Sequence, residues 1–363
     1  MKLARRTLAA VAIGAGALAL TAAAYAQSKL TVIPSLQCPI GCGVVVYNVQ
    51  LSNMMARNGA KVSLAPQETP GFMYNIRYMD ENYSGKAKHT AFGTEDMVLQ
   101  LGVHGGKGLI KDSLPNPVKN NFKFLWEIAA TANGRFYVTF DPKIKTVADM
   151  KGKKIDLGLL TQSDWGLSAR LVLEQYGISK KNASINFVTP AVMTDQLING
   201  TADVVTSAIL GDPGTGKWAT GGPLVKIGAA AKASGRKLHY ISVSNETIEK
   251  INKKYGTTLF TKTLPAGTLP GQEEPVTIGL NRVYLAVTTD FPNDIAYELT
   301  KATIQNGPAL KSEGGLWNFW SKEGMVSGLN ECNTNAGAIK AFKEMNVWEL
   351  RTKGGPEAKI PGC

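Results

Sequence analysis

Three consecutive pieces of this chain decide its fold: RFYVTFDPKIKTVADMKGKKIDLG (135–158), TQSDWGLSARLVLEQYG (161–177) and INFVTPAVMTDQLINGTADVVT (185–206). They predict strands over 135–140, 154–158, 185–188 and 202–206, and helices over 164–176 and 190–199. Gly177 and Gly200 follow these helices and end them. Strands that alternate with helices form parallel sheets, and ligands bind outside the carboxyl ends of such strands.

The polar turn 161–164 lies at one of these strand ends. Thr161 and Asp164, three residues apart, have the form of a capping box, which starts a helix and leaves its first amide N–H groups pointing out of the turn. A carboxylate of a ligand would fit at such a helix start. The alternative is that the box only caps the helix, which is the commoner use of this pattern.

The N-terminus predicts an export signal. Lys2, Arg5 and Arg6 precede an apolar run, and Ala24-Tyr25-Ala26 is a small-x-small cleavage site, so we expect a mature, exported protein that starts at residue 27. A membrane anchor is the alternative, but the run is short, and no later segment is apolar enough to span a bilayer. Removal of the three basic residues lowers the formal charge from +12 to +9. The basic residues are scattered and export argues against nucleic acid, so we expect a solvated surface.

The order of several segments resembles a known family. TVADMKGKKIDLG (146–158), a polar turn and helix, and QLINGTADVV (196–205) resemble the second lobe of a bilobal extracytoplasmic solute-binding protein. LPAGTLPGQ (264–272), VTIG (276–279) and NAGAIKAFKE (335–344) resemble the TAXI-type receptors of tripartite (TRAP) secondary importers. The resemblance implies a type II periplasmic binding protein fold, with two mixed-sheet α/β lobes joined by a hinge. Lobe 1 would comprise 27–136 plus 277–363, and lobe 2 would comprise 137–276.

Lobe 1 should begin with a strand at 30–33, a glycine-rich loop at 34–43 and a helix at 44–57. A strand at 61–65, a strand at 88–92 and a helix from 93–96 should follow, and the long strand 276–287 should return to this lobe. The resemblance implies a cleft between the lobes and a monomer that delivers its solute to TRAP membrane permease subunits. By the same resemblance, together with the polar turn, the expected ligand-binding residues are Thr69, Gly71, Tyr74, Asn75, Thr94, Glu95, Thr161, Gln162, Ser163, Asp164, Trp165, Gly211 and Asp212.

Four cysteines of an exported chain favour disulfides, and they allow three connectivities. Proximity in the sequence suggests Cys38–Cys42 and Cys332–Cys363. The first pair would add little global stability but would stiffen the loop at the cleft. A soft-metal site is the less favoured alternative, because an oxidising compartment favours disulfides. A redox-active pair is also less favoured, because no thioredoxin-like context surrounds these residues.

No motif for catalysis is evident. The three histidines have no metal-ligand spacing, and no nucleophile elbow, phosphate loop or dinucleotide fingerprint occurs. We therefore expect a binding protein with no catalytic residues, no metal and no cofactor. Trp165 and Tyr74 could stack on a ring of the ligand or simply pack, and the acids Glu68, Glu95, Asp164 and Asp212 favour a zwitterion or a hydroxylated ligand over a bare anion.

The expected solute is a small organic acid or an amino-acid-like molecule. Three rival functions stay open. They are a receptor for an ABC importer of the nitrate, sulfonate or thiamine-precursor type, a ligand-sensing subunit of a signalling system, and an exported bilobal enzyme.

Overall fold

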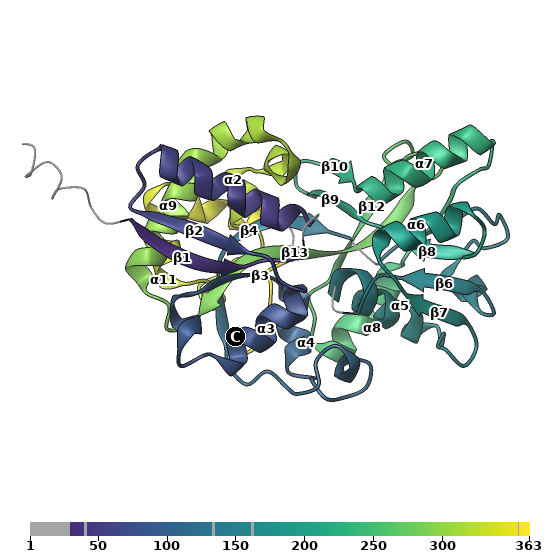
Figure 1. Cartoon of the computed structure of the whole chain (residues 1–363), viewed down its shortest axis with the longest axis horizontal. Coiled ribbons are helices and arrows are strands. Elements are labelled where there is room, and N and C mark those ends of the chain that lie inside the picture. Colours follow the sequence, from purple (N-terminus) through teal and green to yellow (C-terminus); the bar gives the residue numbers. More distant parts are fainter. Residues whose placement is uncertain (1–29, 40–41, 133–134, 161–162, 355) are drawn as a thin grey trace, which may run out of the picture.

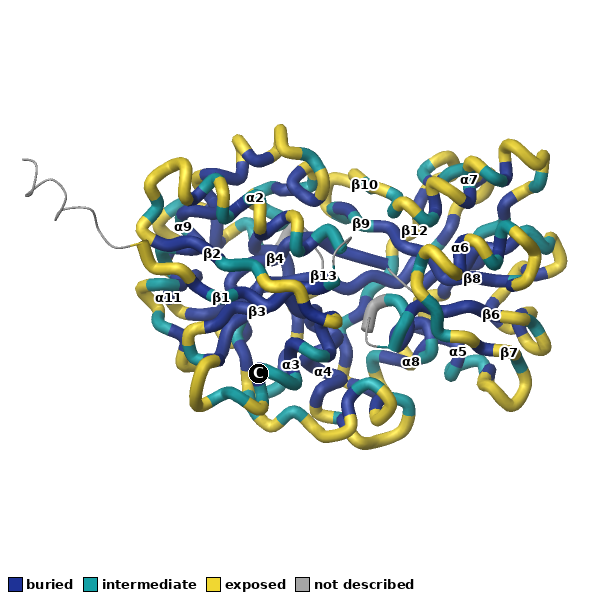
Figure 2. The backbone as a smooth tube through the Cα atoms, viewed as in Figure 1, coloured by how far each residue is buried: buried dark blue, intermediate teal, exposed yellow. Residues whose placement is uncertain are grey.

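The computed structural model describes residues 30–363 apart from 40–41, 133–134, 161–162 and 355, and describes 163–164 and 352–354 by their backbone alone. The predicted signal peptide lies outside the described residues. The described chain forms two lobes, each a sheet covered by helices, with strands that cross between them (Figure 1). Most strands are buried, whereas the outer faces of the helices are exposed (Figure 2).

The first lobe is built on a sheet with the order β10-β9-β4-β13-β3-β1-β2. The three strands β1, β2 and β3 are parallel, and β13 and β4 then join them in antiparallel pairs. These strands are β1 (Thr31–Leu36), β2 (Val62–Gln67), β3 (Ala91–Glu95), β4 (Phe122–Thr131) and β13 (Val276–Thr288).

The second lobe repeats this arrangement. Its sheet has the order β11-β5-β8-β6-β7, in which β6 pairs in parallel with β7 and β8, while β5 and β11 pair antiparallel. These strands are β5 (Tyr137–Thr139), β6 (Lys154–Leu157), β7 (Ser184–Phe187), β8 (Val204–Thr206) and β11 (His239–Ile241). The predicted bilobal α/β fold with two mixed sheets is therefore confirmed.

Strand β13 belongs to both lobes. Its first part, Val276–Leu280, pairs with β12 (Phe260–Leu264), and its second part, from Asn281 on, pairs with β4 and β3. The hairpin of β9 (Ile209–Asp212) and β10 (Lys217–Thr220) extends the first sheet through β4, although it lies inside the range 137–276 expected for lobe 2. We therefore propose the predicted lobe boundaries with this hairpin assigned to the first sheet.

Helices cover both sheets. In the first lobe they are α2 (Gly43–Arg57), α3 (Phe72–Glu81), α4 (Asp96–Gly102), α9 (Asn293–Leu310), α10 (Lys322–Met325) and α11 (Ala336–Glu344). In the second lobe they are α5 (Ser168–Gln175), α6 (Pro190–Ile198), α7 (Gly222–Ser234) and α8 (Asn245–Tyr255). Short 3-10 helices lie at Lys86–His89, Ile110–Asp112, Val147–Met150, Lys311–Glu313, Gly315–Phe319 and Trp348–Gly354, and a π-helix occupies Ser163–Leu167.

The predicted strand at 88–92 begins three residues too early. Lys88 and His89 end a 3-10 helix, and the strand begins at Ala91, while α4 begins only at Asp96. The stretch 317–347 holds two short α-helices, α10 and α11, separated by irregular backbone. Helix α7 and strands β9, β10 and β12 were not anticipated, because the Gly- and Pro-rich segments that border them are more typical of loops.

Two buried apolar clusters hold the lobes. One fills the first lobe and continues beneath α5 and α8 of the second lobe, and the other lies on the opposite face of the second sheet, under α6 and α7. Among the described residues, no helix is both long and apolar enough to cross a membrane.

Candidate functional site

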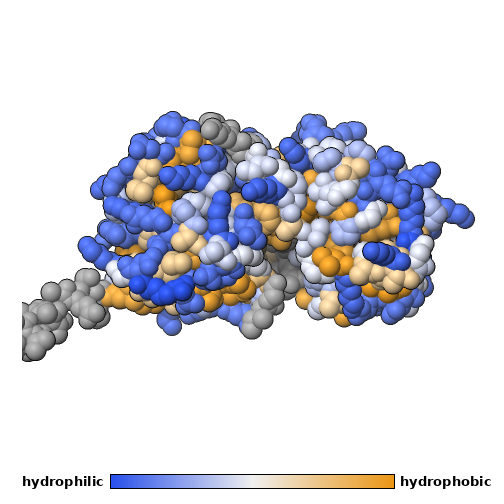
Figure 3. Space-filling model, turned by 90° about the horizontal axis from the view of Figure 1, so that it is seen from above, coloured by the Kyte–Doolittle hydropathy of each residue, from blue (hydrophilic) through white to orange (hydrophobic). Residues whose placement is uncertain are grey.

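A cavity of about 720 Å³ lies between the lobes. Seen from above, the two lobes meet at a waist (Figure 3). Thr131 of β4 and Val283 of β13 contribute to this cavity from the crossing strands, and the remaining lining residues come from both lobes. Cavities of this size hold drug-sized or smaller organic molecules.

In the described part of the chain, four helices contribute residues of their first turn to this cavity. They are α2 through Gly43 and Val44, α3 through Phe72, α6 through Pro190 and Ala191, and α7 through Gly222 and Pro223. The first N–H groups of a helix have no partner within the helix, and the helix dipole places partial positive charge there. Several helix starts at one cavity therefore favour an anionic group of a ligand.

The capping of these four helices reinforces this preference. None of them carries an acidic residue in its first turn, and α2, α3 and α7 receive no hydrogen bond from a capping side chain. By contrast, α4, α8, α9 and α10 carry Asp96, Glu246, Asp294 and Glu323 in their first turns. Helix α6 is capped by Thr189, whose hydroxyl accepts a bond of 3.4 Å from the Val192 amide.

Gly71 shows why α3 begins as it does. It is the residue before α3, lines the cavity and has φ = 135°, a conformation that residues with a side chain rarely adopt. The sequence Thr69-Pro70-Gly71 therefore turns the chain sharply so that α3 starts at the cavity wall.

The lining carries one charged side chain among the described residues, Lys226. Its ammonium lies 2.6 Å from the Asp195 carboxylate, and both side chains are more than half exposed. No described carboxylate lines the cavity, so the expectation that acidic residues surround the ligand has no support from Glu68, Glu95 or Asp212. Much of the wall is apolar, with Phe72, Leu159, Trp165 and Leu210.

Thr69 and Asn75, two expected ligand contacts, lie beneath the cavity wall. The Asn75 amide donates to the carbonyl oxygens of Gln37 at 2.6 Å and Gly93 at 2.9 Å. The Thr69 hydroxyl lies 2.9 Å from the Gln37 carbonyl oxygen and 2.7 Å from Asn75 Oδ1. Both side chains are buried, so these bonds hold the loop that follows β1. Tyr74 stacks at 6.2 Å on Tyr78 of the same helix.

The other expected residues are distributed unevenly. Trp165 lines the cavity, and Thr94 and Glu95 are buried at the end of β3. Thr161 and Gln162 lie outside the described residues, as do the side chains of Ser163 and Asp164. The helix predicted over 164–176 is present as the π-helix Ser163–Leu167 continued by α5.

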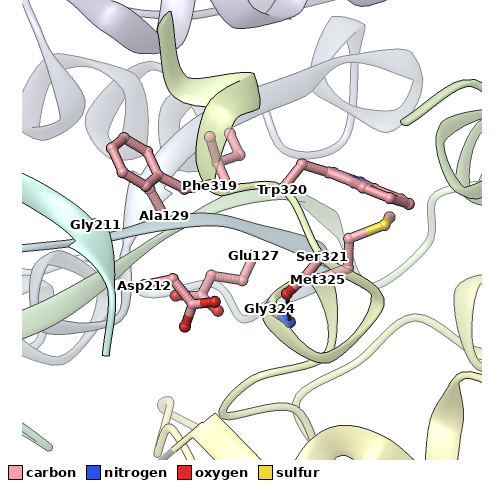
Figure 4. Close-up of a pocket in the computed structure, with 10 residues that line it drawn as sticks. Glu127, Ala129, Gly211, Asp212, Phe319, Trp320, Ser321, Gly324 and Met325 are labelled. Carbon is pink, nitrogen blue, oxygen red and sulfur yellow. Dashed lines mark hydrogen bonds between the residues drawn. The ribbon is translucent and has the colours of Figure 1, made fainter. Parts of the chain in front are cut away.

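Gly211 and Asp212 line a second, much smaller hollow of about 10 Å³, with room for about one water molecule. Figure 4 shows the carboxylates of Asp212 and Glu127 side by side in this hollow. Asp212 Oδ1 accepts a bond of 2.8 Å from the Gly214 amide, so Asp212 shapes the turn of the β9–β10 hairpin.

A buried group of ionisable residues beside the strands that cross between the lobes was not anticipated. Glu127, Asp96 and Arg282 are all at most 6% exposed, and Arg282 Nε lies 3.9 Å from Glu127 Oε1. Burial raises the pKa of Glu127 to about 8, although Arg282 opposes this rise. Arg135 is also buried and donates from Nε to the Gly279 carbonyl oxygen at 3.0 Å and from a terminal nitrogen to that of Thr131 at 2.8 Å.

The hydrogen bonds of Arg135 tie β4 to β13 where these strands cross between the lobes. A sequence signal was present, since Arg135 and Arg282 stand within or beside apolar strand segments. The partners Gly279 of Arg135 and Glu127 of Arg282 are nevertheless far away in the chain.

The two disulfides join Cys38 to Cys42 and Cys332 to Cys363, as sequence proximity suggested. Cys38 and Cys42 line the cavity. The second bridge ties the C-terminal residue to the segment before α11.

A sequence profile described as the NMT1-like family matches residues 45–345. Among solved structures, MatC from Rhodopseudomonas palustris with bound malate is 10% identical, with a TM-score of 0.44 over 89% of this chain and 99% of its own. A TctC solute binding protein from Polaromonas is 17% identical, with a TM-score of 0.40 over 88% of this chain and 97% of its own. The aliphatic sulphonate binding protein SsuA from Escherichia coli is 14% identical, with a TM-score of 0.33 over 62% of this chain and 91% of its own.

Proposed function

Because this chain belongs to the NMT1-like family, we propose that it is an extracytoplasmic solute-binding receptor. It captures a small organic acid in the cavity between its lobes and delivers it to a membrane importer. The observation that carries the proposal is the meeting of four uncharged helix starts at one cavity of about 720 Å³ in the described chain.

The composition of the cavity supports a carboxylate attached to an apolar body. Amide groups at the helix starts suit the carboxylate. Phe72, Leu159, Trp165 and Leu210 suit a hydrocarbon or aromatic part. An amino-acid-like solute would also need a partner for its ammonium group. Asp164 is the candidate for that role among the predicted residues, and the substitution Asp164→Asn tests it.

The transport partner is a TRAP-type permease in this proposal, which rests on the resemblance of residues 264–279 and 335–344 to the TAXI receptors. The periplasm is the proposed location, because two disulfides suit an oxidising compartment and the N-terminus has the form of a cleavable signal. The protein binds its solute without changing it chemically.

Native mass spectrometry of protein purified without refolding tests the function, because it identifies a solute carried along from the cell. Calorimetric titration then compares five carboxylates (phenylacetate, 3-methyl-2-oxobutanoate, succinate, malate and 2-oxoglutarate) with neutral phenylacetamide and succinamide. We expect at least one carboxylate to bind, and its amide to bind at least tenfold more weakly, a difference of about 1.4 kcal/mol. A cationic co-purified solute, or equal affinity for acid and amide, would refute the proposal.

Two further measurements address the partner and the absence of turnover. Uptake of the solute into vesicles that contain the membrane proteins encoded by the neighbouring genes should depend on an ion gradient. Dependence of this uptake on ATP would instead favour an ABC importer. The bound solute should be recovered unchanged after incubation with stoichiometric protein, whereas a product formed over many turnovers would place the chain among enzymes.

A further inference from the structure

The Cys38–Cys42 disulfide stands in the wall of the cavity, next to the start of a helix. Cys38 follows β1 by two residues and is buried, and Cys42 is the residue directly before α2. Both cysteines, and Gly43 and Val44 after them, line the cavity. The bridge therefore ties the end of the first strand of the lobe to the start of α2 at the cavity wall.

The loop is also held from beneath. Its Gln37 backbone carbonyl lies within hydrogen-bond distance of Thr69 and Asn75, and its Gln37 side chain accepts a bond of 3.0 Å from Asn48 of α2. All four of these side chains are buried, so a polar network supports one end of the loop. At the other end, near Cys42, the disulfide supplies the covalent support.

Cys42 occupies the position where a helix is normally capped by Ser, Thr, Asp or Asn. Such a side chain would fix the helix start by accepting a bond from one of its first amides. Here the Cys42 side chain makes no capping hydrogen bond, and a covalent bridge to Cys38 holds this residue instead. The bridge thus holds the helix start, while the Cys42 side chain leaves the first amides of α2 without a capping bond.

We propose that the Cys38–Cys42 disulfide is a positioning element of the binding cleft, which holds Cys42 and the start of α2 in the conformation that receives the solute. This inference rests on the proposed binding of an organic acid. Without the bridge, Cys42 at the start of α2 would have to be ordered when the solute binds. Ordering one residue costs roughly a factor of ten in affinity.

The chain contains a matched control. Cys332–Cys363 closes a longer segment, with a sequence separation of 31 against 4 for Cys38–Cys42. A longer closed loop restricts the unfolded chain more, so the loss of Cys332–Cys363 should lower stability more. Neither Cys332 nor Cys363 is among the residues that line the cavity.

The experiment compares the double variants C38A/C42A and C332A/C363A with the unchanged protein. Titration with the tightest-binding carboxylate among those named above, well below the melting temperature, should give a Kd about tenfold higher for C38A/C42A. The Kd of C332A/C363A should stay unchanged although its melting temperature falls further. Equal Kd values for C38A/C42A and the unchanged protein would overturn the inference and leave the proposed function intact.

A second measurement needs no solute. Hydrogen–deuterium exchange of the peptide that covers the loop and the first turn of α2 should become faster in C38A/C42A, with no change at α6 or α7. If none of the carboxylates binds, the proposed function fails, and this measurement still decides the inference. Unchanged exchange at the loop and at α2 would show that the polar network alone holds them.

Discussion

An acidic residue placed at the start of α7 should weaken solute binding without harming the fold. Gly222 is the first residue of α7, lines the cavity and is exposed. A Cβ atom at this position would meet no atom within 4 Å, so a side chain fits. The substitution Gly222→Asp adds a negative charge at a helix start, as α4, α8, α9 and α10 carry in their first turns. It should leave helix stability unchanged or raise it by about 0.3–1 kcal/mol.

The size of the effect follows from the cavity. A volume of about 720 Å³ is that of a sphere with a radius of about 6 Å, which sets the distance between the new carboxylate and the solute. Two unit charges about 6 Å apart repel each other by about 0.7 kcal/mol in water and about 2.8 kcal/mol at an effective dielectric constant of 20. The Kd of an anionic solute should therefore rise between about threefold and a hundredfold.

Titration calorimetry of Gly222→Asp, Gly222→Asn and the unchanged protein, with the co-purified solute, measures this effect. The Asn variant has the same shape without the charge, so its Kd should stay close to that of the unchanged protein. The difference between the Asp and Asn variants should shrink as salt is added, because salt screens exposed charges. Equal Kd values for the two variants at low salt would show that the cavity does not select an anion.

Three further outcomes are expected. The variant C38A/C42S should melt at a higher temperature than C38A/C42A, because a serine cap stabilises a helix by about 0.5–2 kcal/mol. It should nevertheless bind an acidic solute more weakly than C38A/C42A, because the serine hydroxyl occupies an amide of α2. Tighter binding by C38A/C42S would show that these amides do not contact the solute. Because burial raises the pKa of Glu127 from 4.5 to about 8, its contribution to stability is present below about pH 4.5 and is lost as the pH rises to 8. In thermal melts between pH 5 and 8.5, Glu127→Gln should therefore gain stability relative to the unchanged protein by up to about 1.4 kcal/mol per pH unit. If the melting temperatures of the two proteins changed in parallel with pH, Glu127 would not be neutral in the folded protein. Asp112 and Arg170 form a 2.8 Å ion pair between the lobes. A double-mutant cycle with Asp112→Asn and Arg170→Gln should give a coupling free energy of about 0.5–1 kcal/mol that decreases as salt is added. A coupling free energy of zero would mean that the pair is only a surface contact.

Much of the fold could be predicted from local sequence. The alternation of strands and helices over 135–206 appears in the structure within one to three residues at most boundaries. Gly177 and Gly200, which were expected to end two helices, both have positive φ. Cys38 and Cys42 are close enough in the chain that their pairing required no tertiary information. These features are local, because periodicity, helix ends and short loops depend on residues a few positions apart.

The orientation of polar side chains could not be predicted in the same way. Asn75 stands beside residues that line the cavity, but its amide is bound to Gln37, which lies 38 positions away. Arg282 is likewise held near Glu127 by strand pairing between segments more than 150 positions apart. Whether such a side chain faces a ligand or the interior depends on what packs against it.

The sequence by itself determined two α/β lobes, their order along the chain and the disulfide in the loop at the cavity. Only the tertiary structure decided that α2, α3, α6 and α7 start at one cavity, and that helix α7, absent from the predicted elements, is one of them. The physical reason is that a helix start carries its unpaired amides wherever it lies. The packing of distant strands such as β13 against β3 and β4 determines which helix starts meet.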